Sequence, residues 1–146
     1  MKKALVVVAV FSLLFGAAYS GQIETVYKEG ISLLQAENYD GAIEKFEQIL
    51  SESRTHSLSD NAQYWLGECY YSKLQFARAK DEFLKVLDFP KSNKTPDAIL
   101  KVGLCYKEMG EIELARYYLV EVISFYPELS VAKRGTEELK TLMDKK

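Results

Sequence analysis

Residues 62–87 read AQYWLGECYYSKLQFARAKDEFLKVL, and this stretch decides the fold of the chain. The apolar residues of its first half recur at the i, i+3, i+4 and i+8 spacing of one helix face: Leu66, Cys69, Tyr70 and Leu74. After a short break, the second half shows the same helical spacing: Phe76, Ala79, Phe83, Val86 and Leu87. We therefore predict two short helices here, packed against each other as an antiparallel hairpin.

The hairpin pattern occurs three times along the chain, with shifts of 37 and then 36 residues. A glycine precedes an alanine by 12 residues in every copy: Gly30 and Ala42, Gly67 and Ala79, Gly103 and Ala115. Such small residues predict close contact between two helix backbones, because larger side chains would push them apart. A period of this size predicts stacked supersecondary units.

The sequence thus predicts an all-α solenoid of three helix-turn-helix repeats, at about residues 23–52, 60–89 and 96–127. Thr95 followed by Pro96 indicates a capped helix start at the third repeat. After the third repeat, Ser130 is expected to cap a last helix at about residues 131–143. A single extra helix of this kind closes the exposed end of a solenoid.

The first 20 residues have the pattern of a secretory signal peptide. Two lysines precede the apolar run ALVVVAVFSLLF at residues 4–15, and Ala18 and Ser20 place small side chains at the signal-peptidase positions. The run is shorter than the ~20 apolar residues of a spanning helix, so cleavage after Ser20 is favoured over an uncleaved anchor. We predict a domain of residues 21–146 that is exported to the periplasm and is not inserted in the membrane.

Composition argues against several classes of function. The 146 residues suit one globular unit, and 19 basic and 21 acidic residues give a net charge of −2 without a basic patch for nucleic acid. One histidine and two cysteines are too few for a usual zinc site. No phosphate-binding loop or nucleophile elbow occurs. We expect no enzyme activity, no metal and no cofactor.

The remaining titratable residues have plain structural interpretations. The acidic pairs fall on expected outer helix faces, where solvated charge explains them better than catalysis: Asp81 and Glu82, Glu111 and Glu113, Glu137 and Glu138. His56 is expected in a solvated loop. Cys69 and Cys105 occupy equivalent places in successive repeats, and an exported protein could join them in a disulfide. Neighbouring helices lie ~8–10 Å apart, too far for that bond, so two free thiols are predicted.

The order of glycine, alanine and aromatic residues in these hairpins resembles the tetratricopeptide repeat (TPR). The segments NAQYWLGECYY at residues 61–71 and TPDAILKVG at residues 95–103 resemble the C-terminal TPR domain of the periplasmic, Tol–Pal-associated YbgF/CpoB family. The resemblance implies a non-catalytic adaptor or scaffold that binds a peptide or helix of an envelope protein, with a link to cell division. Family members trimerise through a coiled coil before the repeats. Here only a few residues separate the predicted cleavage site from the first repeat, so a monomer or weak homo-oligomer is expected.

In TPR arrays the first helix of each pair lines the concave surface, so the resemblance implies a groove for a partner. The residues expected in it are Tyr27, Ile31, Leu34, Tyr64, Trp65, Glu68, Tyr71, Leu100, Lys101, Leu104 and Lys107. Aromatic residues in a groove are typical binding hot spots, although single ones could instead fill the core between repeats. Only Lys101 matches the chemistry of the clamp that some TPR domains use for a terminal carboxylate, so that clamp is not expected.

Other functions remain open at this point. The chain could be a structural unit that self-associates through its first repeat, which no preceding repeat covers at Val26 and Leu33. It also resembles TPR lipoproteins that act as accessory factors of outer-membrane protein assembly, but these carry a lipidated cysteine where this chain has Gly21. A substrate-handling subunit of an enzyme complex is a third alternative.

Overall fold

The computed structural model describes residues 21–144, and the predicted signal peptide lies outside them. Residues 21–35 are helical. The helices that follow are α2 (Tyr39–Glu52), α3 (Ser59–Ser72), α4 (Phe76–Val86), α5 (Thr95–Glu108), α6 (Ile112–Phe125) and α7 (Ser130–Met143). Within the described range the rest of the chain forms turns and short links without a strand.

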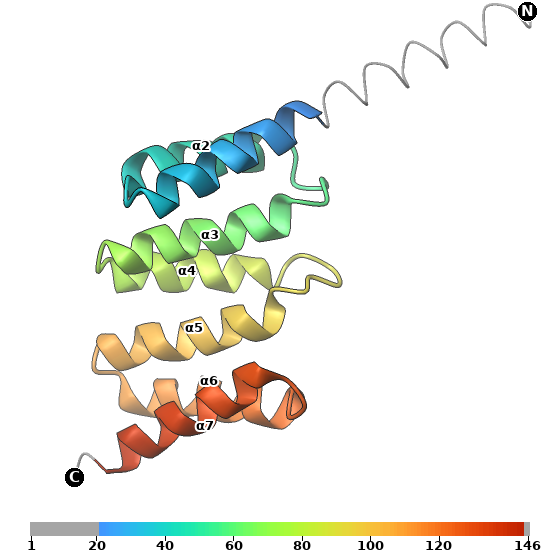
Figure 1. Ribbon diagram of the computed structural model, residues 1–146. Coiled ribbons are helices and arrows are strands. Elements are labelled where there is room, and N and C mark those ends of the chain that lie inside the picture. The colour runs from blue at the N-terminus through green and yellow to red at the C-terminus, as the bar shows by residue number, and fades with distance from the viewer. Residues whose placement is uncertain (1–20, 145–146) are drawn as a thin grey trace, which may run out of the picture.

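The helices form one stack in chain order. Figure 1 shows the helix of residues 21–35 at one end of the stack and α7 at the other. Each helix from α2 to α6 packs mainly on the next one, and α7 packs on α6 and also contacts α5. This arrangement confirms the predicted all-α solenoid, in which repeats contact only their neighbours.

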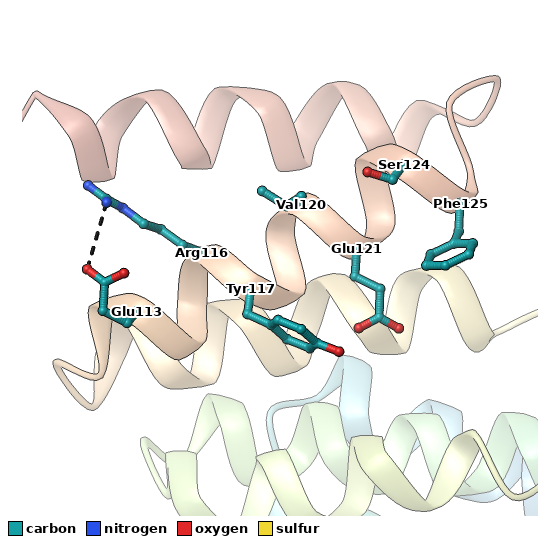
Figure 2. A pocket seen from close by; sticks show the side chains of 7 residues that line it. All are labelled: Glu113, Arg116, Tyr117, Val120, Glu121, Ser124 and Phe125. Atoms are coloured by element: carbon teal, nitrogen blue, oxygen red, sulfur yellow. Dashed lines mark ion pairs between the residues drawn. The ribbon is translucent and has the colours of Figure 1, made fainter.

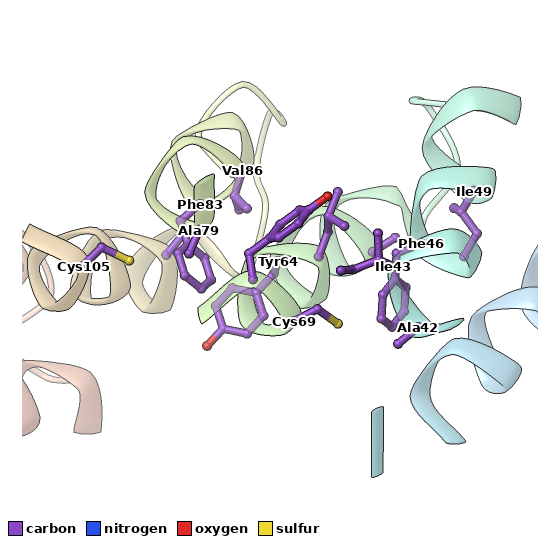
Figure 3. Packing of buried hydrophobic residues seen from close by; sticks show 14 of the residues in the cluster. Ala42, Ile43, Phe46, Ile49, Tyr64, Cys69, Ala79, Phe83, Val86 and Cys105 are labelled. Carbon is purple, nitrogen blue, oxygen red and sulfur yellow. The ribbon is translucent and has the colours of Figure 1, made fainter. Parts of the chain in front are cut away.

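The small residues lie where the two helices of a pair touch. A Cβ atom on Gly67 would lie 2.7 Å from the Phe83 ring, and one on Gly30 would lie 2.9 Å from the Phe46 ring. Ala79 is fully buried in the same contact. In Figure 3 Phe83 and Ala79 point from α4 toward α3, whose Tyr64 ring centre lies 5.4 Å from that of Phe83. In the first two repeats an aromatic ring of the paired helix therefore fills the space beside the glycine, and in the third repeat Leu119 lies beside Gly103.

Two predicted helix caps are not formed. Pro96 lies in the first turn of α5 as predicted, but the helix already begins at Thr95, and Lys94 in the capping position makes no side-chain bond. Ser130 is likewise the first residue of α7, after an uncapped Leu129. Both helices begin one residue earlier than predicted, so neither hydroxyl stands in the N-cap position.

The turn inside each hairpin has the same backbone geometry in all three repeats. Glu37, Leu74 and Gly110 occupy equivalent positions and have φ values of 57°, 58° and 80°. At the second turn the Leu74 N–H donates to Tyr71 O, and the next N–H donates to Tyr70 O, both at 2.9 Å. This is the Schellman motif that ends helices with a left-handed residue.

Replacement of Leu74 by glycine is expected to stabilise the protein. A left-handed conformation costs a non-glycine residue ~1–2 kcal/mol, partly offset by the greater entropy that glycine loses on folding. Leu74 is 73% exposed, so little packing is lost. We expect Leu74→Gly to raise the free energy of unfolding by about 0.5–1 kcal/mol in urea denaturation. Gly110→Ala is the matched control and should lower it; a stabilised Gly110→Ala would contradict the argument.

The first repeat is better covered than its sequence suggested. Ile23 is fully buried and Val26 is only 7% exposed, and Leu33 packs against the same core cluster. The expectation that Val26 is left uncovered is therefore wrong. The apolar face of the helix at residues 21–35 is buried within its own chain, which removes the main argument for self-association through this repeat.

Candidate partner-binding site

Side chains on the first helix of each pair, and on the capping helix α7, make contacts that connect one repeat to the next. Three pairs make these contacts, which we call the first-helix ladder: Tyr27 with Trp65, Glu68 with Lys101, and Lys107 with Glu138. The pairs join residues 21–35 to α3, α3 to α5, and α5 to α7. Each contact links elements about one repeat apart in the sequence.

The ladder pairs have close hydrogen-bond and ion-pair geometry. Trp65 Nε1 donates to Tyr27 Oη at 2.8 Å. Lys101 Nζ donates to Glu68 Oε2 at 2.8 Å and lies 2.7 Å from Oε1, and both side chains are mostly buried. Lys107 Nζ lies 2.6 Å from Glu138 Oε2. Partly buried pairs of this kind are screened less by salt than exposed ones.

Aromatic rings and ammonium groups alternate beside the ladder. Lys101 Nζ lies 4.7 Å from the centre of the Tyr71 ring. Lys94 Nζ lies 5.5 Å from the Tyr64 ring centre and 5.8 Å from that of Trp65. All three distances fall within the range of cation–π attraction. The face therefore offers aromatic surface together with cationic groups that are held in place.

The tyrosines near Glu68 keep their protons. Burial raises the pKa of Tyr71 to about 12, and the carboxylate of Glu108 adds to the rise. Burial also raises the pKa of Tyr64, with the negative charge of Glu68 as the second cause. At neutral pH both phenols are therefore neutral, and each can donate a hydrogen bond.

The structure divides the eleven predicted groove residues into two groups. Eight are partly exposed: Tyr27, Ile31, Leu34, Trp65, Glu68, Tyr71, Lys101 and Lys107. Three are buried, so their prediction as groove-lining side chains is not supported: Tyr64 at 8% exposed, Leu100 at 1% and Leu104 at 9%. The leucines belong to the core cluster that α5 forms with Leu142 of α7. The capping helix covers positions that would otherwise line a groove.

Some residues treated as solvated charges have specific partners. Glu138 is part of the first-helix ladder, and Glu82 accepts a hydrogen bond from the buried Gln63 side chain at 2.8 Å. His56 is half-buried, and its Nδ1 accepts from the Leu58 N–H at 3.2 Å. The solvated interpretation is therefore wrong for these three. The sequence did contain a signal for the Glu138 ion pair, because Lys107, of opposite charge, lies about one repeat earlier.

The two cysteines are free and fully buried, as the helix spacing predicts. Burial raises the pKa of each thiol to about 12. Because the thiolate is the reactive form, folded protein should hardly react with thiol reagents at pH 8.

We expect a thiol titration to count two groups in denaturant without reductant, and close to none in the folded protein. Cys69→Ala and Cys105→Ala variants, which should each count one, serve as controls. A count of zero in denaturant would reveal a disulfide and contradict the stacking of α3 and α5.

Three cavities lie away from the first-helix ladder. One of about 470 Å³ lies along α6, between Glu113 and Phe125 (Figure 2). One of about 370 Å³ lies between two links, near Arg54 and Lys91, and one of about 410 Å³ lies beside Leu74. In residues 21–144 no group of three metal-ligating side chains comes together. None of the helices described there has the length and apolar character to cross a bilayer.

Comparison with known proteins identifies the repeats. Two tetratricopeptide-repeat family models match the chain, one at residues 33–89 and one at residues 97–128. A search of curated proteins found no match.

Solved structures share the fold at low sequence identity. PcrH from Pseudomonas aeruginosa is similar with a TM-score of 0.72 and 16% identity, over 84% of this chain and 92% of that one. A type III secretion complex from Aeromonas hydrophila gives 0.71 and 21%, over 86% and 83%. The first TPR of Spaghetti, bound to an HSP90 peptide, gives 0.71 and 16%, over 86% and 93%.

Proposed function

Because the chain is built of tetratricopeptide repeats, we propose that it is a non-catalytic adaptor that binds a protein partner through its first-helix face. The observation that carries the proposal is the partly exposed aromatic surface of Tyr27, Trp65 and Tyr71 beside the first-helix ladder. Aromatic side chains that are held in place lose little entropy on binding and are typical hot spots. A TPR domain of similar fold, that of Spaghetti, is bound to an HSP90 peptide, which supports peptide binding as the role of this chain.

The chemistry of the face favours an amphipathic helix or an extended peptide as ligand. Its aromatic rings suit apolar anchor side chains, and the ammonium groups of Lys94, Lys101 and Lys107 suit acidic neighbours of those anchors. Lys101 and Lys107 are already paired with carboxylates. We therefore expect these two lysines to orient the bound peptide more than to strengthen its binding. The affinity for the peptide is assigned mainly to the aromatic rings.

We further propose that the partner is an envelope protein and that the chain works in the periplasm. The signal-peptide pattern of residues 1–20 supports export. The resemblance of residues 61–71 and 95–103 to the YbgF/CpoB family supports a role near the Tol–Pal or cell-division machinery.

Capture from envelope extract tests the adaptor function. Immobilised wild-type protein should retain a defined partner, and Tyr71→Ala should retain much less of it because the aromatic anchor is lost. Leu87→Ala, at an exposed position at the end of α4, is the control and should capture as well as wild type. Equal capture by all three proteins would contradict binding at the first-helix face.

Export is tested by the intact mass of protein recovered from the periplasm. The mass should match a chain that begins at Gly21, because Ala18 and Ser20 suit the peptidase. Ala18→Phe should block this cleavage, since the peptidase position takes only a small side chain. Wild-type protein that retains Met1 in a membrane fraction would contradict the prediction.

A further inference from the structure

The capping helix α7 covers the third-repeat part of the first-helix face. Leu100 and Leu104 of α5 are buried, and they share one core cluster with Val131 and Leu142 of α7. Tyr71, which belongs to the proposed binding surface, packs against the same cluster. The position of α7 therefore adjoins the surface that the partner is proposed to use.

α7 is itself an amphipathic helix with an acidic residue beside its apolar face. Its large apolar residues pack on the core cluster: Val131, Leu139 and Leu142. Its opposite face carries exposed charged residues: Lys133, Glu137 and Lys140. At the edge of the apolar face, Glu138 pairs with Lys107 of α5 at 2.6 Å. α7 therefore has the chemistry that the first-helix face favours in a ligand, apolar anchors with an acidic neighbour.

The charge of Glu138 also acts on the neighbouring repeat. Burial raises the pKa of Tyr71, and nearby carboxylates, Glu138 among them, add to the rise. The side chain of Glu138 thus lies close to an aromatic residue of the proposed binding surface as well as to Lys107. An acidic residue of a partner helix in this place would make the same two contacts.

α7 is attached to the stack on one side. Figure 1 shows α7 at the end of the stack, and it packs on α6 and also on α5, whereas each helix from α3 to α6 packs between two neighbours. Two of its four buried residues are Ala132 and Gly135, which bury little apolar side chain, and its first turn has no side-chain cap. Elements with few buried apolar contacts open locally at a lower cost than the whole protein. α7 can therefore detach while the remaining helices stay folded.

We propose that α7 is a displaceable occupant of the first-helix face, and that an amphipathic helix of the partner takes its place on α5. This rests on the proposed function, because the competing helix is that of the partner. While α7 is bound, Leu100, Leu104 and Lys107 are occupied, so only molecules with α7 detached offer them. The apparent affinity for a competing helix is therefore reduced by the fraction of such molecules.

A labelled synthetic peptide with the sequence of residues 130–143 tests this displacement on the full chain, with fluorescence anisotropy as the measurement. Glu138→Lys in the chain places like charges against each other at Lys107 and weakens the attachment of α7. This variant should bind the peptide about tenfold more tightly than the wild-type chain does. Glu137→Lys makes the same charge change at an exposed position and is the control, which should bind the peptide as the wild type does.

Lys107→Glu tests the same ion pair from its other side. This variant repels its own α7, and it should bind a peptide that carries Glu138→Lys about tenfold more tightly than the unmodified peptide, because only the changed peptide offers the opposite charge. Hydrogen exchange should become faster in α7 of both variants and stay the same in α3 and α4, which shows that the stack remains folded.

Three results would overturn the proposal. Equal peptide binding by the wild type and Glu138→Lys would make α7 a fixed part of the fold, and so would a loss of hydrogen-exchange protection that spreads through the whole stack. Equal binding of both peptides by Lys107→Glu would show that they do not occupy the position of α7. None of these results bears on the surface of Tyr27, Trp65 and Tyr71, whose role is contradicted separately if Tyr71→Ala captures as much partner as the wild type.

Discussion

Phe83→Ala should lower the free energy of unfolding by about 3–5 kcal/mol, the usual loss when a buried phenylalanine leaves a cavity. Phe83 is fully buried in the central repeat. Its ring fills the space that the missing side chain of Gly67 leaves, and its centre lies 5.4 Å from that of Tyr64. The rigid contact between α3 and α4 gives the site little freedom to collapse.

Urea denaturation followed by circular dichroism measures this effect. Leu87→Ala, at a 40% exposed position a few residues later, is the control and should cost about 0.5 kcal/mol or less. Because the central repeat joins the first to the third, Phe83→Ala should also broaden the transition as the ends of the stack uncouple. A loss below 1 kcal/mol would mean that the contact between α3 and α4 is much looser than the structure has it.

Trp65→Ala should weaken partner binding by about 2 kcal/mol or more, as truncation of an aromatic hot spot does. Its ring is partly exposed and lies 5.4 Å from the Tyr64 ring, and its Nε1 donates to Tyr27. The same change removes packing from the core cluster. We therefore expect a stability loss of about 2 kcal/mol, which is less than a fully buried aromatic residue would cause.

Affinity and melting temperature must be measured together to separate these effects. Trp65 is the only tryptophan in the chain, so its fluorescence reports partner binding directly in the wild type. Trp65→Phe keeps most of the ring packing and loses the bond to Tyr27, and it should retain most of the stability. If Trp65→Ala shows a large fall in melting temperature but its folded fraction binds the partner with full affinity, the prediction that Trp65 lies in the binding face is contradicted.

The helices and their pairing could be predicted from sequence because both depend on local patterns. The apolar spacing within residues 62–87 marks two helices, and the glycine-to-alanine gap of 12 residues marks where they touch. Gly67 and Ala79 indeed lie at the contact between α3 and α4. The exact ends of the helices were less predictable, because a shift of one residue moves Ser130 from the capping position into the helix.

The candidate site was predicted only in outline. Analogy with TPR arrays places Leu100 and Leu104 in a groove, but α7 packs over them and buries them. The sequence also left Lys107 and Glu138 as separate charges, whereas the stack brings them to 2.6 Å. Whether a residue of a first helix is exposed depends on how the next repeat packs against it. The apolar spacing within one helix carries no information about that packing.

The sequence by itself determined the helix hairpins, their number and the small residues at their contacts, since helix periodicity and side-chain volume act within about 40 residues. The tertiary structure alone decided which aromatic and charged side chains stay accessible. It joined Trp65 to Tyr27 and Glu68 to Lys101 across neighbouring repeats, and it left several large apolar side chains of α6 exposed. The physical reason is that the burial and ion pairing of these side chains depend on the helix that packs against them. That helix belongs to another repeat.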